Sequence, residues 1–227
     1  MLSDDVWAEL RGQGRSRSFP ERSVLLRQGA PGTHLLALTT GLAKVVFREP
    51  TGAVTWLAFR GPGDLLGEVS VFNGTERTAE VVALTPCTAV VLEAERFVRF
   101  VQERGLVVDL MRQALDRLRE SDAHRTELRT LPLVARLART LLRLAELTAT
   151  EAASTDRDSS GDRGSSRGPV RLTGLNQEEI AQAIGVTRNA AITGLRRLRA
   201  DGALETARRM IVIRDMDALR YWASVEG

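Results

Sequence analysis

The sequence is poor in the residues that build covalent cross-links and metal centres. Cys87 is the only cysteine, and His34 and His124 are the only histidines. A single thiol excludes disulfides within one chain, and it excludes zinc or iron–sulfur sites that need several cysteines. The sequence also shows no nucleophile–base constellation and no glycine-rich phosphate loop. We therefore expect no metal site, no cofactor and no enzymatic activity.

Long hydrophobic runs are also missing. The apolar stretches 81–84 and 89–92 are interrupted around Pro86, far short of the ~18 apolar residues that a membrane-spanning helix needs. Residues 1–5 lack the apolar core of a secretory signal. We therefore expect a cytoplasmic protein that does not contact a membrane. The 227 residues are 43% hydrophobic and 27% charged, which is typical of a globular protein with one or two domains.

Charge is distributed unevenly along the chain. Residues 1–130 carry 17 basic and 17 acidic side chains. Residues 185–214 carry seven arginines against Asp201 and Glu205, a net charge of +5. A polyanionic partner is therefore expected to bind the C-terminal part. The segment 151–169 is rich in serine, glycine, aspartate and arginine, which predicts a flexible insertion.

Short strands are predicted in an N-terminal domain, residues 1–100. Apolar or alternating segments lie at 35–38, 43–47, 54–59, 79–83 and 88–92. Glycine- and proline-containing turns separate them. Strands of this length and spacing are typical of a small β-barrel or sandwich.

After Glu95 the hydrophobic pattern changes to that of a helix. Steps of four and three residues link Val107, Met111, Ala114, Leu118, Ser121, Arg125 and Leu128. One helix cannot bury such a heptad seam alone, so a helix over 101–131 is predicted to form a parallel homodimer. The alternative is that the stripe packs on the β-domain. Pro132 ends this helix, and a second amphipathic helix is predicted to run to about Leu147.

A segment between two predicted strands suits a phosphorylated sugar. Gly67-Glu68 is followed, nine residues after the glutamate, by Arg77-Thr78-Ala79. The Arg77 guanidinium matches phosphate geometry, Thr78 adds a hydroxyl donor, and Glu68 can accept a hydrogen bond from a ribose hydroxyl. Gly67 lets the backbone approach a ligand closely. The alternative is a structural Glu68–Arg77 ion pair beside a turn glycine.

Residues 132–227 predict a DNA-binding domain. Asn176 and Glu179 form a capping box at the start of one helix. Gly185 then makes a turn, and Thr187 starts a second helix. A short strand at 170–172 and a hairpin of 204–206 with 210–213 complete the layout of a winged helix-turn-helix.

The second helix of such a motif enters the major groove by its N-terminal end. Arg188, Asn189 and Thr193 are therefore expected to face base edges. Phosphate contacts are expected from basic side chains, including Arg208 and Arg209 at the tip of the hairpin. The complete set of expected DNA contacts is Gln177, Thr187, Arg188, Asn189, Thr193, Arg196, Arg197, Arg208 and Arg209. The alternative is that the arginines only form a solvated helix face.

The sequence resembles the cyclic-AMP receptor protein/FNR (Crp/Fnr) family of bacterial regulators over nearly its whole length. The resemblance rests on the glycine-punctuated strands, the cassette Gly67-Glu68…Arg77-Thr78-Ala79, the long helix and the winged helix-turn-helix. It implies an α+β protein with a jelly-roll-like cyclic-nucleotide-binding β-roll, a dimerisation helix and a C-terminal DNA-binding domain. In nucleotide-binding members, the residue at the Glu68 position holds the ribose 2′-hydroxyl. The residue at the Arg77 position binds the cyclic phosphate, and the residue at the Thr78 position contacts the phosphate or the base.

The resemblance implies further contacts. Ser121 and Asp122 fall where members of the family contact adenine, although Asp122 replaces a second hydroxyl. Oxygen-sensing and haem-binding members need cysteines or axial ligands that this sequence lacks at matching positions. The usual recognition helix reads Arg-Glu-x-x-x-Arg, of which only Arg188 matches, with Asn189 and Thr193 at the other two positions. The preferred operator is therefore expected to differ from the common one.

The sequence thus predicts a homodimeric, sequence-specific transcription regulator that a cyclic nucleotide controls. The expected partners are an inverted-repeat DNA operator and RNA polymerase. Cyclic AMP is the expected ligand because of Ser121, while Thr78 also suits cyclic GMP. One alternative is the same regulator acting without a ligand, or sensing cyclic GMP or cyclic di-GMP. Another is a nucleotide-binding interaction module without specific DNA binding.

Overall fold

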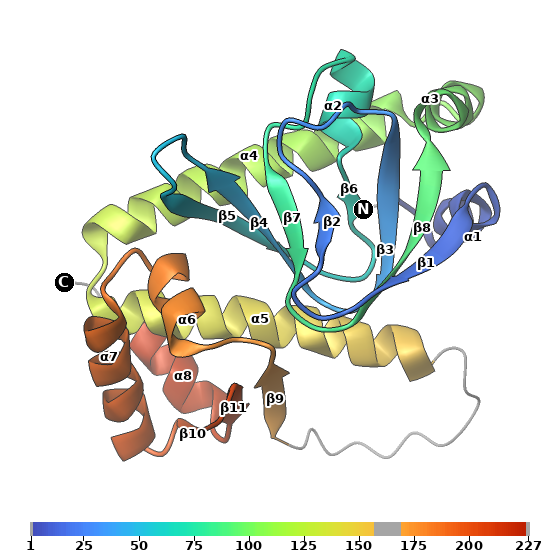
Figure 1. Ribbon diagram of the computed structural model, residues 1–227. Helices are drawn as coiled ribbons and strands as arrows, with labels where there is room; N and C mark the ends of the chain where they lie inside the picture. The colour runs from blue at the N-terminus through green and yellow to red at the C-terminus, as the bar shows by residue number, and fades with distance from the viewer. Residues whose placement is uncertain (1, 157–168, 226–227) are drawn as a thin grey trace. The chain divides into compact units, whose positions relative to one another are not determined.

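The protein forms two compact units, residues 1–122 and residues 123–227. Figure 1 shows the computed structural model, which describes residues 2–156 and 169–225. The boundary between the two units falls within one long helix, residues 107–130. No helix among the described residues is long and apolar enough to cross a membrane.

The first unit contains two antiparallel sheets. One sheet contains β1 (Arg15–Phe19), β3 (His34–Thr40), β6 (Leu65–Leu66) and β8 (Cys87–Glu93), in the order β1-β8-β3-β6. The other contains β2 (Val24–Leu26), β4 (Ala43–Arg48), β5 (Val54–Arg60) and β7 (Glu80–Ala83), in the order β2-β7-β4-β5. The predicted small β-domain is confirmed, and its two facing sheets form a β-roll (Figure 1).

Strand β3 explains why this segment is apolar at nearly every position. Its side chains alternate between the two faces of the sheet. Leu36 and Leu38 belong to a core with Leu26, Val81 and other residues of both sheets. Leu35 and Ala37 belong to a second core, on the other face. Both faces of the sheet are therefore covered, and complete burial of each leucine contributes about 1.5–3 kcal/mol.

Helices cover the outer face of this sheet. They are α1 (Asp4–Gly12) and α3 (Ala94–Glu103), which contribute Leu10, Phe97, Phe100 and Val101 to the second core. A short helix, α2 (Glu68–Asn73), lies between β6 and β7. Helix α4 (Val107–Thr130) follows α3 after a turn at Gly105, whose φ of 64° ends α3.

Three strands of the first unit were not predicted. The exposed part of β1 is polar, since Arg15, Ser16, Arg17 and Ser18 are all exposed and only Phe19 is buried. Strands β2 and β6 have only three and two residues, too short for a period to be recognised. The five predicted strands are present, with ends that differ by one or two residues.

The second unit combines helices with a small sheet. Its elements after α4 are α5 (Leu133–Asp156), β9 (Val170–Thr173), α6 (Gln177–Ala183), α7 (Arg188–Ala200), β10 (Leu204–Ala207), β11 (Met210–Ile213) and α8 (Met216–Ser224). The sheet order is β10-β11-β9. Leu137, Leu141 and Leu144 of α5 are at most 1% exposed and form part of the core of this unit.

The predicted helix-turn-helix is confirmed in detail. The Asn176 side chain accepts a hydrogen bond from the Glu179 backbone N–H, and the Glu179 carboxylate accepts one from the Asn176 N–H. This is the predicted capping box. Gly185 turns the chain with a φ of 65°, and Thr187 caps α7. The basic hairpin is also present, with Ala207 paired to Met210 and two residues at its tip.

Two predicted helix boundaries were wrong. The dimerisation helix was placed at 101–131, but α4 begins at Val107 because residues 101–103 complete α3. The second helix was expected to end near Leu147, but α5 continues to Asp156, where alanines favour a helix. Residues 157–168 of the expected insertion lie outside the described part of the chain.

The Glu127 carboxylate links α4 to α5 on the two sides of the turn between these helices. Glu127 of α4 forms ion pairs with Arg139 and Arg143 of α5, the first at 3.2 Å. Its side chain is 13% exposed. Pro132 sits in the turn, where it interrupts the helix as predicted. Ion pairs between side chains therefore connect the two helices in addition to the peptide backbone of the turn.

Candidate functional site

A cavity of about 210 Å³ lies in the first unit. Its lining includes all five residues of the predicted cassette, which are Gly67, Glu68, Arg77, Thr78 and Ala79. Leu26, Val45 and Val81 add apolar walls. A pocket with apolar walls and a few converging polar groups has the composition of a ligand site. The structure thus brings the cassette together around one space.

Gly67 permits this arrangement. It precedes α2 with a φ of 85°, a conformation that residues with a Cβ rarely adopt. A Cβ at this position would lie 2.1 Å from Nη1 of Arg77. The bare glycine therefore allows the arginine side chain to pass directly beside the backbone.

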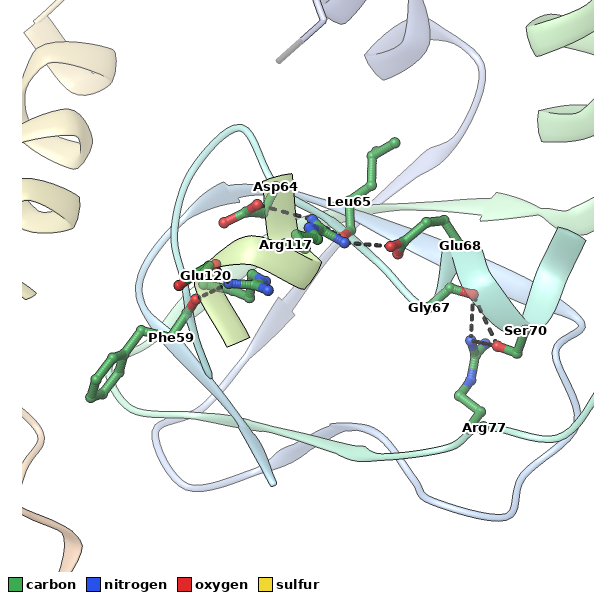
Figure 2. A network of polar contacts seen from close by, with 10 residues as sticks. Phe59, Asp64, Leu65, Gly67, Glu68, Ser70, Arg77, Arg117 and Glu120 are labelled. Atoms are coloured by element: carbon green, nitrogen blue, oxygen red, sulfur yellow. Dashed lines mark hydrogen bonds and ion pairs between the residues drawn. The ribbon is translucent and has the colours of Figure 1, made fainter. Parts of the chain in front are cut away.

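Arg77 is buried, with 4% of its surface exposed. Its Nη1 donates to the Ser70 hydroxyl at 2.9 Å and to the Gly67 carbonyl at 3.1 Å. Its Nη2 donates to the His34 carbonyl. These three acceptors fix the plane of the guanidinium. Figure 2 shows the contacts of Arg77 with Gly67 and Ser70. Burial lowers the pKa of Arg77, and the nearby Glu68 carboxylate opposes that shift.

Glu68 pairs with Arg117 of α4, and not with Arg77. Arg117 also donates to Asp64 at 3.0 Å and to the Leu65 carbonyl at 2.8 Å (Figure 2). Burial acts to lower the pKa of Arg117, but Glu68 and Asp64 outweigh it, so the pKa is raised. The Glu68–Arg77 ion pair considered from the sequence is thus absent among the described contacts, and a helix residue takes its place.

The two predicted base contacts, Ser121 and Asp122, stay a prediction. Ser121 is half-buried and Asp122 is exposed, both on α4. Neither lines the cavity as the described residues form it. The cavity is reached instead by Arg60 of β5, which forms a 3.2 Å ion pair with Glu120.

Sequence reasoning missed Arg60, Ser70 and Arg117 at this site. Arg117 was open to detection, because it lies four residues before Ser121 and such residues share a helix face. Ser70 lies inside the predicted cassette, but a serine there has no distinctive spacing. Arg60 directly follows the predicted strand 54–59, at a position where an arginine is most often solvated.

Helix α4 also presents an exposed apolar face. The exposed large side chains on it are Val107, Val108, Met111, Leu115 and Leu118, each 49–59% exposed. None of the residues of α4 is buried within the single chain. An apolar stripe of this kind on a monomer marks an interaction surface.

A groove of about 700 Å³ lies in the second unit, between the helix-turn-helix and the hairpin. Five of the predicted DNA contacts line it, namely Gln177, Arg188, Arg196, Arg208 and Arg209. Arg199, which was not predicted, also lines it, three residues after Arg196 on the same helix face. Thr187, Asn189, Thr193 and Arg197 do not line it in the described chain. The groove is therefore strongly cationic.

Local contacts already order the start of α7. Arg188 Nη2 lies 3.3 Å from Oε1 of Gln177, the first residue of α6. The Thr187 hydroxyl accepts from the Ala190 N–H, which caps the helix. Asn189 remains exposed, while the Thr193 hydroxyl donates to the Asn189 carbonyl at 3.1 Å.

Arg197 has a different environment from the other arginines of α7. Its guanidinium lies over the ring of Trp222 in α8, 4.6 Å from the ring centre. The Trp222 indole N–H in turn donates to Asp201, the C-cap residue of α7. This contact ties the end of α7 to α8, an element that was not predicted.

The described residues contain no group of three or more histidine, cysteine, aspartate or glutamate side chains that could hold a metal ion.

Comparisons with known proteins match both units. Residues 16–104 match the sequence model of the cyclic nucleotide-binding domain, and residues 135–222 match that of the Crp-like helix-turn-helix domain. The first match contains the cassette and the second contains the residues that line the groove. All of α4, including Arg117 and Glu120, lies between the two matches.

Relatives with known names are similar over much of the chain. A CRP-like cAMP-activated global transcriptional regulator of Mycobacterium tuberculosis is 27% identical over 214 residues, 93% of this chain and 89% of the relative. The cAMP-activated global transcriptional regulator CRP of Salmonella typhimurium is 29% identical over 130 residues, 56% of this chain and 62% of the relative. A solved CRP-family transcriptional regulator of Thermus thermophilus is 27% identical, with a TM-score of 0.69, and the match covers 92% of this chain and 97% of that one.

Proposed function

Because the chain belongs to the Crp/Fnr family of transcription regulators, with a cyclic-nucleotide-binding domain and a helix-turn-helix domain, we propose that it is a homodimeric regulator controlled by cyclic AMP. One observation carries the nucleotide part of this proposal. The same cavity is lined by Gly67, Glu68, Arg77 and Thr78, which offer a phosphate fork, a hydroxyl donor and a ribose acceptor. The name of the Mycobacterium relative supports cyclic AMP as the ligand.

The nucleotide would replace contacts that the protein now makes with itself. A cyclic phosphate beside Arg77 competes with the Gly67 carbonyl and the Ser70 hydroxyl for Nη1. A ribose hydroxyl at Glu68 competes with Arg117. Arg117 belongs to α4. If the ribose hydroxyl replaces Arg117 as the partner of Glu68, α4 loses one of its ion pairs with the β-roll. A ligand shifts a conformational equilibrium only through such differential contacts.

The exposed stripe on α4 supports the homodimer. A stripe that repeats every three to four residues and includes Met111 and Leu118 fits a second copy of the same helix in parallel. Two helix-turn-helix units related by a two-fold axis then read an inverted-repeat operator, with half-sites about 10–10.5 base pairs apart.

The cationic groove supports contact with the DNA backbone. Arg196, Arg199 and Arg208 line it, and arginines in such positions bind phosphates without reading sequence. Arg188, at the start of α7, is the base reader in this proposal, with Asn189 and Thr193 beside it on exposed turns of the helix. We place the regulator in the cytoplasm with its DNA, and we propose RNA polymerase as its further partner.

One observation favours a second candidate, a regulator that binds DNA without any nucleotide. Arg77 and Glu68 have protein partners, so the charges of these two cassette residues are compensated within the chain. Cyclic GMP and cyclic di-GMP remain alternative ligands, and Thr78 in the cavity suits a guanine amino group.

Binding to a pool of random duplex DNA at fixed salt tests these functions together. The protein is measured without nucleotide and with cyclic AMP, cyclic GMP or cyclic di-GMP. We expect enrichment of an inverted repeat that depends on cyclic AMP. Equal enrichment without nucleotide would establish the ligand-independent regulator. No enrichment in any condition, at a salt concentration where random DNA binds, would favour an interaction module without specific DNA binding.

A further inference from the structure

The cavity has a charged wall beyond the cassette. Arg60, the last residue of β5, lines it and its side chain is 12% exposed. Nη1 of Arg60 lies 3.2 Å from Oε2 of Glu120 in α4 and 2.6 Å from the Phe59 carbonyl. Both contacts use Nη1, so Nε and Nη2 have no hydrogen-bond partner in the described part of the chain. Two donors of this arginine are therefore available to a ligand.

The polar groups follow an order along the site. In Figure 2, Arg77 and Ser70 lie on one side of Arg117, and Glu120 lies on the other side. Glu68 lies between Arg117 and Ser70. A cyclic nucleotide carries its phosphate, ribose and base in one direction. If the phosphate binds Arg77 and the ribose binds Glu68, the base extends toward Arg60, which lines the cavity. It also extends toward Glu120, which is not among the lining residues but is the ion-pair partner of Arg60. This step rests on the nucleotide control proposed above.

The pair offers a donor beside an acceptor. The N7 edge of adenine presents an acceptor, N7, next to a donor, the 6-amino group, whereas the same edge of guanine presents two acceptors. Arginine only donates and an ionised glutamate only accepts. We propose that Arg60 and Glu120 select adenine, with Arg60 donating to N7 and Glu120 accepting from the 6-amino group.

A purely structural ion pair between β5 and α4 predicts something different. Glu120 is 44% exposed, and ion pairs of this exposure contribute little to stability. Loss of a structural tether would weaken the binding of every nucleotide by the same factor. Loss of a base contact changes the ratio between nucleotides. The ratio is therefore the quantity to measure.

The first experiment is calorimetric titration of the full-length protein with cyclic AMP, cyclic GMP and the 6-deamino analogue of cyclic AMP. We expect the unchanged protein to prefer cyclic AMP to the 6-deamino analogue by about tenfold. In Glu120→Ala this preference falls to within about twofold, and the relative affinity for cyclic GMP rises because Arg60 alone is a fork for O6 and N7. Asp116→Ala, which breaks an exposed ion pair with Arg119 on the same helix, is the matched control and keeps the original ratios.

The second experiment tests Arg60 with 7-deaza cyclic AMP, in which a C–H group replaces N7. The unchanged protein should bind this analogue about tenfold more weakly than cyclic AMP, whereas Arg60→Ala should bind both alike. If cyclic AMP binds but the ratios are the same in the variants and the unchanged protein, the adenine selector is overturned and nucleotide control stands. A preference of the unchanged protein for cyclic GMP also overturns the selector. If no nucleotide binds the unchanged protein, the proposed nucleotide control fails, and the selector fails with it.

Discussion

Nη2 of Arg117 lies 3.0 Å from Oδ1 of Asp64, while Nη1 of the same guanidinium binds Glu68. One residue of α4 therefore forms ion pairs with two carboxylates of the β-roll. The side chains of the three residues are 15–24% exposed, so water screens these charges only in part. The β-roll and the N-terminal half of α4 are joined by this contact.

Arg117→Ala is expected to destabilise the first unit, because Asp64 and Glu68 lose their common counter-charge. Hydrogen bonds to charged groups contribute about 1.5–3 kcal/mol, and we expect the free energy of unfolding to fall by that amount in urea titrations. Arg112→Ala is the control, because Arg112 and its partner Asp109 are exposed. The control should change stability by less than about 0.5 kcal/mol. Equal effects of the two variants on the free energy of unfolding would contradict a stabilising role of the ion pairs of Arg117 with Asp64 and Glu68.

Arg77→Ala is expected to abolish measurable binding of the cyclic nucleotide. The phosphate charge would lose its fork, at a cost of about 2–5 kcal/mol in binding free energy. Arg77→Lys should also weaken binding strongly, since an ammonium group cannot form two parallel hydrogen bonds. Calorimetry measures both variants, and a thermal melt of each checks that it remains folded. An affinity within about threefold of the unchanged protein would remove Arg77 from the phosphate site.

Leu118→Arg is expected to yield monomers. Leu118 is 56% exposed in the single chain, and a buried arginine facing its copy would place like charges across the seam. Light scattering measures the mass, and the monomers should bind operator DNA weakly. Arg119→Ala on the polar face of α4 serves as the control and should remain dimeric. A dimeric Leu118→Arg variant would show that the stripe has another partner.

Arg188→Ala and Arg208→Ala are expected to have different effects on DNA binding. Arg188→Ala should reduce discrimination at one half-site position by about 1–3 kcal/mol. Arg208→Ala should weaken binding to all sequences alike and should reduce the salt slope by about one. Titrations of operator and random DNA at several salt concentrations separate the two effects. Identical behaviour would contradict the division into a base reader and a phosphate contact.

His34 is expected to make stability depend on pH. Burial, followed by the nearby Arg77, lowers the pKa of His34 below the usual value of about 6.5, and Arg17 acts in the same direction against Glu93. As the pH falls below 6.5, His34 becomes protonated in the unfolded chain but stays neutral in the folded chain until a lower pH. The free energy of unfolding therefore falls as the pH drops below 6.5. Urea titrations between pH 8 and pH 5 should show a smaller fall in His34→Gln, and an equal fall would exclude His34 as the cause.

Much of the architecture could be predicted because its signals are local. The capping box of Asn176 and Glu179 spans four residues, and the heptad seam of α4 repeats within one helix. The cassette from Gly67 to Ala79 is likewise one continuous segment, and its five predicted residues line one cavity. Local spacing is sufficient wherever a site is built from neighbours in the chain.

The missed contacts depend on tertiary structure. Arg117 meets Glu68 across 49 residues, and Arg60 meets Glu120 across 60. Neither pair has a spacing that a single sequence reveals, because the fold of the β-roll and the path of α4 bring the partners together. The contact of Arg197 with the ring of Trp222 was also missed, because it depends on α8, an element that was not predicted. The assignment of Arg197 to DNA stays a prediction.

Gly67 has a consequence for genetics. Every single-base change in a glycine codon that replaces the residue introduces a Cβ, and here that atom would lie 2.1 Å from Nη1 of Arg77. Such alleles disturb the nucleotide cavity and leave the residues of the DNA groove unchanged. In a saturation library scored for ligand response, codon 67 should therefore be as depleted as a codon for a ligand contact. In the same library scored for nucleotide-independent binding to random DNA at low salt, it should be tolerated among the folded variants.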